Sequence, residues 1–260
     1  TEPDLVLAPN ATSVETVERL RETGLTVYHF SAATDFENVA DKTSTIGQLT
    51  GNERAARETN AWVEANVEAV STATADAERP RLLYPLLGGF AVGGDTFIDE
   101  IITTAGAENV AAAEFDGYEV LNDERVIELE PEVLLVTDQT EGQILGSEPY
   151  ASTPAGRNGE TVSLEVNYIN QPAPRSLVYS TRNLTTQLHP GLYDESAFVS
   201  RSEAAASLDG SAANATDMDD SNATTDDSPT GVSAPGFGPV VAVLSLVGGS
   251  LLLGRRSGAA

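Results

Sequence analysis

The sequence predicts an α/β fold with two similar lobes joined by one long helix. The stretch Glu2–Ala8 (EPDLVLA) is written a second time as Glu130–Val136 (EPEVLLV). Each copy predicts a short parallel strand, because an aliphatic run without polar alternation suits a strand covered on both faces. From Asn52 to about Ala75 no Gly or Pro interrupts the chain, which predicts a helix of about 23 residues, well above the usual mean. A cleft between two such lobes is a common place for a captured ligand.

The first lobe is predicted as a strand, a helix and a second strand within residues 1–51. Apolar residues recur at helical spacing in Val14–Leu20, Gly24 suits a helix end, and Leu25–Phe30 predicts the next strand. Further helical or irregular structure is expected over Phe36–Leu49. No helix, strand or signal peptide pattern precedes the first strand, so we expect this lobe to be incomplete, in a truncated chain or a fragmentary gene product.

The joining helix is assigned to residues 52–78 and the second lobe to residues 79–193. Trp62 lies among aliphatic neighbours on the joining helix and is expected to pack in the core. The second lobe alternates strands with helices, and His189-Pro190 marks the end of its last helix. Its predicted elements are a strand at Arg81–Pro85, a helix through Phe97–Ile102, a short helix from Asp123, the repeated strand, a strand at Val162–Val166 and a closing helix at Arg175–Leu188.

The charge of the chain excludes nucleic acid as a partner. The 40 acidic and 14 basic residues give a formal net charge of -26, and Lys42 is the only lysine. This balance suits a halophilic organism, since roughly 1 M salt shortens the Debye length to about 3 Å and screens the repulsion between carboxylates. An ordinary acidic protein with an acidic tail is the alternative. The absence of cysteine excludes disulfides and thiolate metal sites.

The last part of the sequence predicts a linker and a membrane anchor. Residues 194–234 are acidic and rich in Ser, Ala and Thr, so we expect a disordered linker that buries too little apolar surface to fold. Phe237–Gly254 carries no charge; as a helix it would be about 27 Å long, close to the roughly 30 Å core of a bilayer. Arg255 and Arg256 would stay inside the cell. Residues 235–256 are therefore assigned as the anchor, with the rest at the extracellular face of the membrane.

Two further signals fit an exported protein. Pro235-Gly236-Phe237, the apolar run and the terminal arginines resemble the archaeal PGF-CTERM surface-sorting signal, which implies cleavage of the tail and a lipid anchor. A plain transmembrane anchor would give the same topology. Asn-x-Ser/Thr sequons occur at Asn10, Asn183, Asn214 and Asn222. They are compatible with a glycoprotein, although so short a pattern also arises by chance.

Six segments carry a resemblance to a known family, and they cover residues 2 to about 193. They are EPDLVLAP, GLTVY, IGQLTG, GGDTFIDEIITTAGAENVAA, LEPEVLLVTD and PAPRSLVYSTRNLTTQLHP. In this order and spacing the chain resembles the BtuF-type substrate-binding proteins of ABC importers, which take up vitamin B12 and, in sister branches, ferric siderophores and haem. The resemblance implies two Rossmann-like lobes joined by a single long helix, the helical-backbone periplasmic-binding-protein fold, with little closure on the ligand.

By this resemblance, three loops hold the ligand: the loop after the first strand, the loop after the strand at Arg81–Pro85, and the loop before the closing helix. The residues implied are Pro9 and Asn10 in the first loop, Tyr84, Leu87 and Phe90 in the second, and Tyr168 and Asn170 in the third.

The resemblance also implies partners: an ABC permease with its ATPase, bound by a monomeric protein that has no cofactor of its own. Glu15 matches the glutamate with which the N-terminal lobe of family members docks onto the permease. Its other interpretation is an acid in the first turn of a helix, where the helix dipole favours it.

Cobalamin or a related corrinoid is the expected ligand, because it brings its own cobalt and needs only flat apolar contact and scattered hydrogen bonds. A bare metal ion is disfavoured, since His29 and His189 are the only histidines and His189 is expected at a helix end. Two alternatives stay open. One is a ferric siderophore, for which Arg175 is the candidate contact, or haem; the other is a truncated surface protein that binds no ligand.

An enzyme is not expected from this sequence. It contains no nucleophile elbow and no zinc signature. Gly88–Gly94 is rich in glycine but lacks both the Lys-Ser/Thr ending of a phosphate loop and the GxGxxG spacing. These glycines are expected to form a tight turn or to let the backbone approach a ligand.

Overall fold

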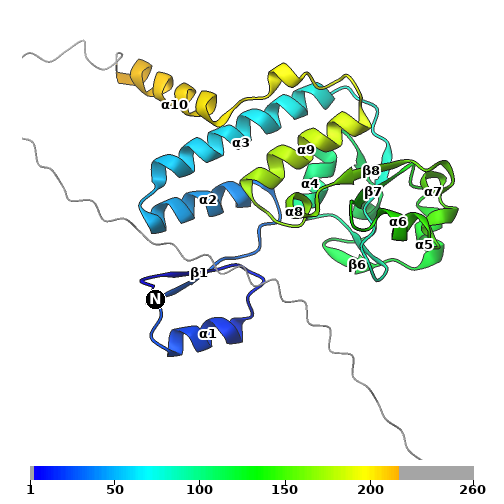
Figure 1. Ribbon diagram of the computed structural model, residues 1–260, viewed down its shortest axis with the longest axis horizontal. Coiled ribbons are helices and arrows are strands. Elements are labelled where there is room, and N and C mark those ends of the chain that lie inside the picture. Colours follow the sequence, from blue (N-terminus) through cyan, green and yellow to red (C-terminus); the bar gives the residue numbers. More distant parts are fainter. Residues whose placement is uncertain (1–2, 217–260) are drawn as a thin grey trace, which may run out of the picture. The chain divides into compact units, whose positions relative to one another are not determined.

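The computed structural model describes residues 3–216, with side chains as far as residue 209. These residues separate into two compact units, which meet in the sequence at Ala32 and Ala33. The first unit is a small strand–helix–strand motif, and the second holds a parallel sheet with helices on both faces (Figure 1).

The first unit is the predicted strand–helix–strand motif. Its two strands pair in parallel, and Ala8, Val17 and Val27 bury the contact between the strands and the helix. Ser13 caps the helix, since its hydroxyl accepts a backbone N–H. The elements are β1 (Val6–Ala8), α1 (Val14–Glu22) and β2 (Val27–His29).

The second unit is built on a parallel sheet in the order β5-β3-β7-β8. The repeated sequence EPEVLLV supplies β7 at the inside of this sheet, where Leu134, Leu135 and Val136 have no exposed surface. This confirms the strand expected from an aliphatic run without alternation. The strands are β3 (Arg81–Leu83), β5 (Glu108–Asn109), β7 (Val133–Thr137) and β8 (Thr161–Leu164).

One face of the sheet is covered by long helices. Leu82 and Leu135 point to this face and share a core with Trp62, Ile101 and Leu177. Figure 1 shows α2, α3 and α9 side by side, and α2 packs against both of the others. The helices are α2 (Phe36–Thr50), α3 (Glu53–Thr74), α4 (Phe97–Thr104) and α9 (Pro174–Leu188).

The opposite face carries shorter helices around a second core. Leu83, Leu134 and Val136 alternate along their strands with residues of the first core, and they pack here against Val126 and Ile144. The elements on this side are α5 (Asp123–Glu128), α6 (Glu141–Leu145), α7 (Pro154–Asn158) and the 3₁₀ turns η1 (Val110–Ala113) and η2 (Tyr150–Ser152).

The helix predicted to join the lobes is α3, with 22 residues at Glu53–Thr74 against the expected 52–78, and it lies within the second unit rather than between the two units. The first lobe was predicted to end at residue 51, but the first unit ends at Ala32. The reason is that α2 belongs to the second unit and packs along α3. Gly47 makes this close approach possible, since a Cβ atom there would lie 2.6 Å from the Cβ of Ala56. Residues 33–50 therefore group with the second unit rather than with the first lobe.

Residues 194–234 were predicted to be a disordered linker. This prediction is wrong for the first part of the segment, which folds onto α3. The indole Nε1 of Trp62 donates to the Val199 carbonyl at 3.0 Å, and Asn66 both donates to that carbonyl at 2.9 Å and accepts from the Val199 N–H at 3.1 Å. The Arg201 guanidinium lies 4.5 Å from the centre of the Trp62 ring. Composition missed this structure because the residues that hold the segment lie far away in the sequence. The elements are η3 (Glu195–Ala197) and α10 (Arg201–Thr216).

The predicted anchor at residues 235–256 lies outside the described residues. Within residues 3–216, no helix combines the length and the apolar character needed to cross a bilayer.

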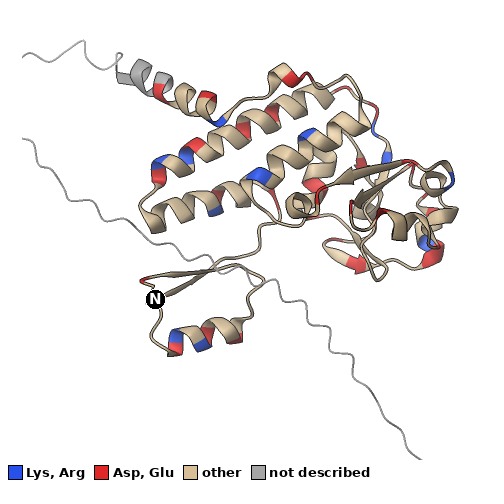
Figure 2. Ribbon diagram, viewed as in Figure 1, with Lys and Arg blue, Asp and Glu red and all other residues tan. Residues whose placement is uncertain are grey.

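Acidic side chains outnumber basic ones over the helices (Figure 2). On α3, for example, Glu53, Glu64 and Glu68 are exposed. Repulsion between such carboxylates opposes the compact state in dilute buffer, and salt screens it.

We therefore expect the midpoint of thermal unfolding to rise by several degrees when KCl is raised from about 0.1 M to about 1 M, as the Debye length falls from about 10 Å to about 3 Å. Far-UV circular dichroism measures this midpoint. Sucrose at equal osmolality is the control, because it strengthens apolar burial without screening charge. A midpoint that rises no more in KCl than in sucrose would contradict the role assigned to the acidic surface.

Candidate ligand-binding site

The sheet of the second unit has a switch point between β3 and β7. The chain leaves β3 towards β5 on one side, whereas it leaves β7 towards β8 on the other side. In open parallel sheets, ligands bind outside the carboxyl ends of the strands at such a point. The residues that follow β3, β7 and β8 are therefore the candidates of this unit.

The chain after β3 turns back on itself. The Leu86 N–H donates to the Phe90 carbonyl at 2.7 Å, and the Val92 N–H donates to the Tyr84 carbonyl at 3.2 Å. Gly88 and Gly89 form the turn with φ angles of 85° and 82°, a region that side chains disfavour. The glycine-rich stretch is thus the tight turn that the sequence predicted.

A second short strand runs beside this turn and extends its surface. β4 (Phe90–Val92) pairs antiparallel with β6 (Tyr118–Val120), so that Phe90 lies opposite Val120 and Val92 lies opposite Tyr118. Alternation along both strands places these side chains on one face. Leu87 in the turn is 50% exposed, Phe90 43%, Tyr118 48% and Val120 60%. We call Leu87, Phe90, Tyr118 and Val120 the hairpin patch; exposed apolar side chains that gather on one hairpin are candidates for an interaction site.

Tyr84 lies in the core rather than in the hairpin patch, with only 2% of its surface exposed. Burial, and then the neighbouring Tyr118, raises the pKa of Tyr84 to about 12. Burial also raises the pKa of Tyr118. Both phenols are therefore neutral near pH 7. Tyr84 packs in the core beneath the hairpin and does not contribute to its exposed surface.

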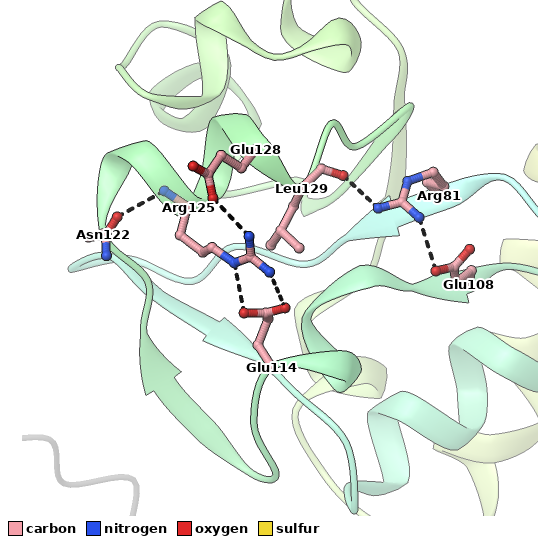
Figure 3. A network of polar contacts seen from close by, with 7 residues as sticks. All are labelled: Arg81, Glu108, Glu114, Asn122, Arg125, Glu128 and Leu129. Carbon is pink, nitrogen blue, oxygen red and sulfur yellow. Dashed lines mark hydrogen bonds and ion pairs between the residues drawn. The ribbon is translucent and has the colours of Figure 1, made fainter.

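Polar contacts fix both ends of β6 (Figure 3). Before the strand, Glu114 receives two hydrogen bonds from Arg125, one of them 2.7 Å long from Nε, and this pairing holds the pKa of Glu114 below its usual range. After the strand, Asn122 caps α5 by accepting the Arg125 N–H at 2.8 Å. Arg125 also pairs with Glu128. Such exposed pairs add little stability, but they fix the course of the chain that presents Tyr118 and Val120.

The chain after β8 leaves the sheet at the same edge, two strands away from β3, which corresponds to about 10 Å. It forms the short helix α8 (Val166–Ile169) with Tyr168 half-buried and Asn170 exposed. The Tyr168 ring packs against Tyr179 of α9 at a centroid distance of 5.2 Å. The two loops predicted within this unit therefore emerge at one edge of one sheet.

The predicted residues of the first unit are all exposed. Pro9 and Asn10 follow β1 in a turn that the Thr12 N–H closes onto the Pro9 carbonyl at 2.9 Å. Glu15 lies in the first turn of α1 and forms an ion pair with Arg19. Ligand contact at Pro9 and Asn10 and docking at Glu15 stay predictions.

Sequence reasoning missed part of this edge. β6 was not predicted, although Tyr118-Glu119-Val120 shows a short apolar alternation that could have indicated it. The exposed Asp138 and Gln139, which follow β7 at the switch point, were also missed. Over residues 3–216, no group of three or more His, Cys, Asp or Glu side chains could hold a metal ion.

Each of the two histidines lies at the end of a regular element. His189 is at the carboxyl end of α9, as predicted, and its Nε2 lies 3.0 Å from the Gly106 carbonyl oxygen. His29 is the last residue of β2 in the first unit.

Comparisons with known proteins agree with this geometry. The periplasmic binding protein family profile matches residues 1–168. The chain is similar to a protein of Halobacterium salinarum named cobalamin-binding protein, with 40% identity over 185 residues, covering 67% of this chain and 50% of that protein. It is also similar to the uncharacterized ABC transporter substrate-binding lipoprotein YvrC of Bacillus subtilis, with 24% identity over 203 residues, covering 74% of this chain and 64% of that protein.

Among solved structures, the periplasmic heme-binding protein RhuT from Roseiflexus sp. RS-1 in apo form is similar with a TM-score of 0.64 and 26% identity. The match covers 71% of this chain and 76% of that chain. The α/β periplasmic-binding-protein fold is thus confirmed. The chain spans half the length of the halobacterial relative.

Proposed function

We propose, because this chain belongs to the periplasmic binding protein family, that it captures cobalamin or a related corrinoid outside the cytoplasm and delivers it to the permease of an ABC importer. The family is one of binding proteins, and no catalytic step is assigned to the chain. The observation that carries the choice of ligand is the 40% identity with the halobacterial protein named cobalamin-binding protein.

The chemistry of the hairpin patch supports this ligand. A corrin ring offers a broad apolar face with amides at its rim, and flat apolar side chains with a few polar groups are what such a ligand needs. The patch supplies an aromatic ring at Phe90, a neutral phenol at Tyr118 and aliphatic contact from Leu87 and Val120. Tyr168 and Asn170 would add a ring and an amide from the loop after β8.

Charge favours a corrinoid over an anionic ligand. The chain has a net charge of -26, and carboxylates that come within about 3 Å of acidic side chains, such as the propionates of haem, are repelled even at roughly 1 M salt. Haem still stays the second candidate, because the chain is similar to the Roseiflexus heme-binding protein. A ferric siderophore and a surface protein that binds no ligand are the remaining alternatives.

The proposed partners are a permease and its ATPase, as the name of the Bacillus relative suggests for that protein. Glu15 is the proposed docking residue of the first unit. Its ion pair with Arg19 is exposed and therefore weak enough to be exchanged for an arginine of a partner.

The ligand is tested by isothermal titration of the whole chain, at about 1 M KCl, with cyanocobalamin, haemin and a ferric hydroxamate in separate arms. Saturable binding of cyanocobalamin with one site per chain supports the proposal. Binding of haemin or the hydroxamate alone would replace it with the corresponding alternative. Absence of binding in all three arms would leave the non-binding surface protein.

Within the hairpin patch, we expect Phe90→Ala and Tyr118→Ala each to weaken cyanocobalamin binding by about tenfold, as truncation of an aromatic contact commonly does. The dissociation constant from the same titration measures this effect. Leu192→Ala is the matched control, since Leu192 is 48% exposed but lies beyond the far end of α9. Equal losses in all three variants would show that the patch has no special role.

A further inference from the structure

The loop of residues 165–173 carries two predicted ligand residues, Tyr168 and Asn170, yet it has little regular structure of its own. Its only helix, α8, is a single turn of four residues. A side chain on such a loop contributes to binding only if something else fixes its position, because otherwise binding must also order the loop. The contacts that fix this loop come from two helices outside it.

The first contact is an aromatic row that begins at Tyr168. Its ring packs against the Tyr179 ring at 5.2 Å, and Tyr179 packs edge-on against Trp62 at 5.9 Å. Trp62 is 1% exposed and is itself fixed by its hydrogen bond to Val199. Tyr179 therefore links a half-buried loop residue to a fixed point in the core.

The second contact holds the loop close to its carboxyl end. Lys42 of α2 donates from Nζ to the Pro172 carbonyl at 3.3 Å, across a large separation in sequence. Lys42 is the only lysine of the chain. It is partly buried, and this burial lowers its pKa, so the ammonium gives up hydration to reach the carbonyl.

We propose that Tyr179 and Lys42 are positioning residues for ligand binding, which hold the loop of residues 165–173 at Tyr168 and at Pro172 so that Tyr168 and Asn170 face the ligand. The inference rests on the proposed function, and it assigns neither residue a contact with the ligand. It goes beyond the residues named from the sequence, which include neither Tyr179 nor Lys42.

The test is a double-mutant cycle read by isothermal titration with cyanocobalamin at about 1 M KCl. Tyr179→Leu should weaken binding by about fivefold, since an aromatic pair is worth about 1 kcal/mol beyond its buried area. In a Tyr168→Ala background the same change should cost less than about twofold, because the pair no longer exists. Tyr179→Phe keeps the ring and should restore the wild-type dissociation constant.

Lys42 is tested in the same way. Lys42→Met should weaken binding by about tenfold, the lower end of the value of one charge-assisted hydrogen bond, and Lys42→Arg should restore it. Hydrogen exchange of the free protein adds a readout without ligand: amides of residues 165–173 should exchange faster in Lys42→Met and Tyr179→Leu.

The titration separates positioning from a loss of folded protein. A partly unfolded variant binds fewer equivalents of ligand with an unchanged dissociation constant, whereas a mispositioned loop changes the dissociation constant at full stoichiometry. If wild type binds cyanocobalamin and both variants bind it equally well, this inference is overturned and the proposed function stands. If wild type binds no cyanocobalamin, the proposed function falls first, and this inference falls with it.

Discussion

Replacing Trp62 by alanine is expected to lower the free energy of unfolding of the second unit by about 3–5 kcal/mol, the usual range for truncating a buried aromatic side chain. Trp62 is 1% exposed. Its removal leaves a cavity against Tyr179, breaks the 3.0 Å hydrogen bond to Val199 and removes the ring beneath Arg201. Urea unfolding followed by far-UV circular dichroism measures the change without needing the tryptophan as a probe.

Trp62→Phe is the matched control for this prediction. It keeps most of the apolar contact but loses the indole N–H, while Asn66 still donates to the Val199 carbonyl. We expect a loss of about 1–2 kcal/mol, the value of one buried hydrogen bond with some repacking. In Trp62→Ala, amides of residues 201–209 should also exchange faster, because the segment loses a fixed point on α3. Equal unfolding midpoints for Trp62→Ala and wild type would contradict the placement of the ring.

Replacing Gly93 by alanine is expected to disrupt the hairpin patch. Gly93 follows β4 where the chain crosses the segment that enters β6, and its N–H donates to the Gly117 carbonyl at 2.8 Å. A Cβ atom at this position would lie 2.2 Å from the Phe115 carbonyl oxygen and 2.5 Å from the Phe115 ring. A backbone oxygen cannot rotate away as a side chain can, so β6 must shift, and Tyr118 and Val120 must shift with it.

For Gly93→Ala we expect a loss of about 3 kcal/mol in the free energy of unfolding, the upper end for overpacking, and at least about tenfold weaker cyanocobalamin binding. Urea unfolding and titration measure the two effects. Gly142→Ala is the control, since nothing lies within 4 Å of the added Cβ atom and alanine favours a helix. Unchanged stability and affinity for Gly93→Ala would contradict the crossing of the two segments.

Part of the candidate site could be predicted because it depends on the ends of strong elements. Residues 133–137 and 53–74 form a strand and a helix whose patterns are long and uninterrupted, so the loops beside the sheet could be located from the sequence. Leu87 and Phe90 were placed in a turn by their glycines, and both are exposed. The burial of Tyr84 and the exposure of Tyr118 and Val120 could not be predicted, because exposure depends on which strand lies alongside.

The sequence by itself determined the α/β class, the order of the main strands and helices and the family, because these follow from local periodicity and from segments in a fixed order. Only the tertiary structure decided that α2 packs with the second unit, that residues 194–209 fold onto α3, and that β6 completes the hairpin patch. Each of these depends on contacts between residues far apart in the chain, such as Trp62 with Val199 or Phe90 with Val120. Periodicity and composition depend only on residues that are close in sequence, so they cannot predict such long-range contacts.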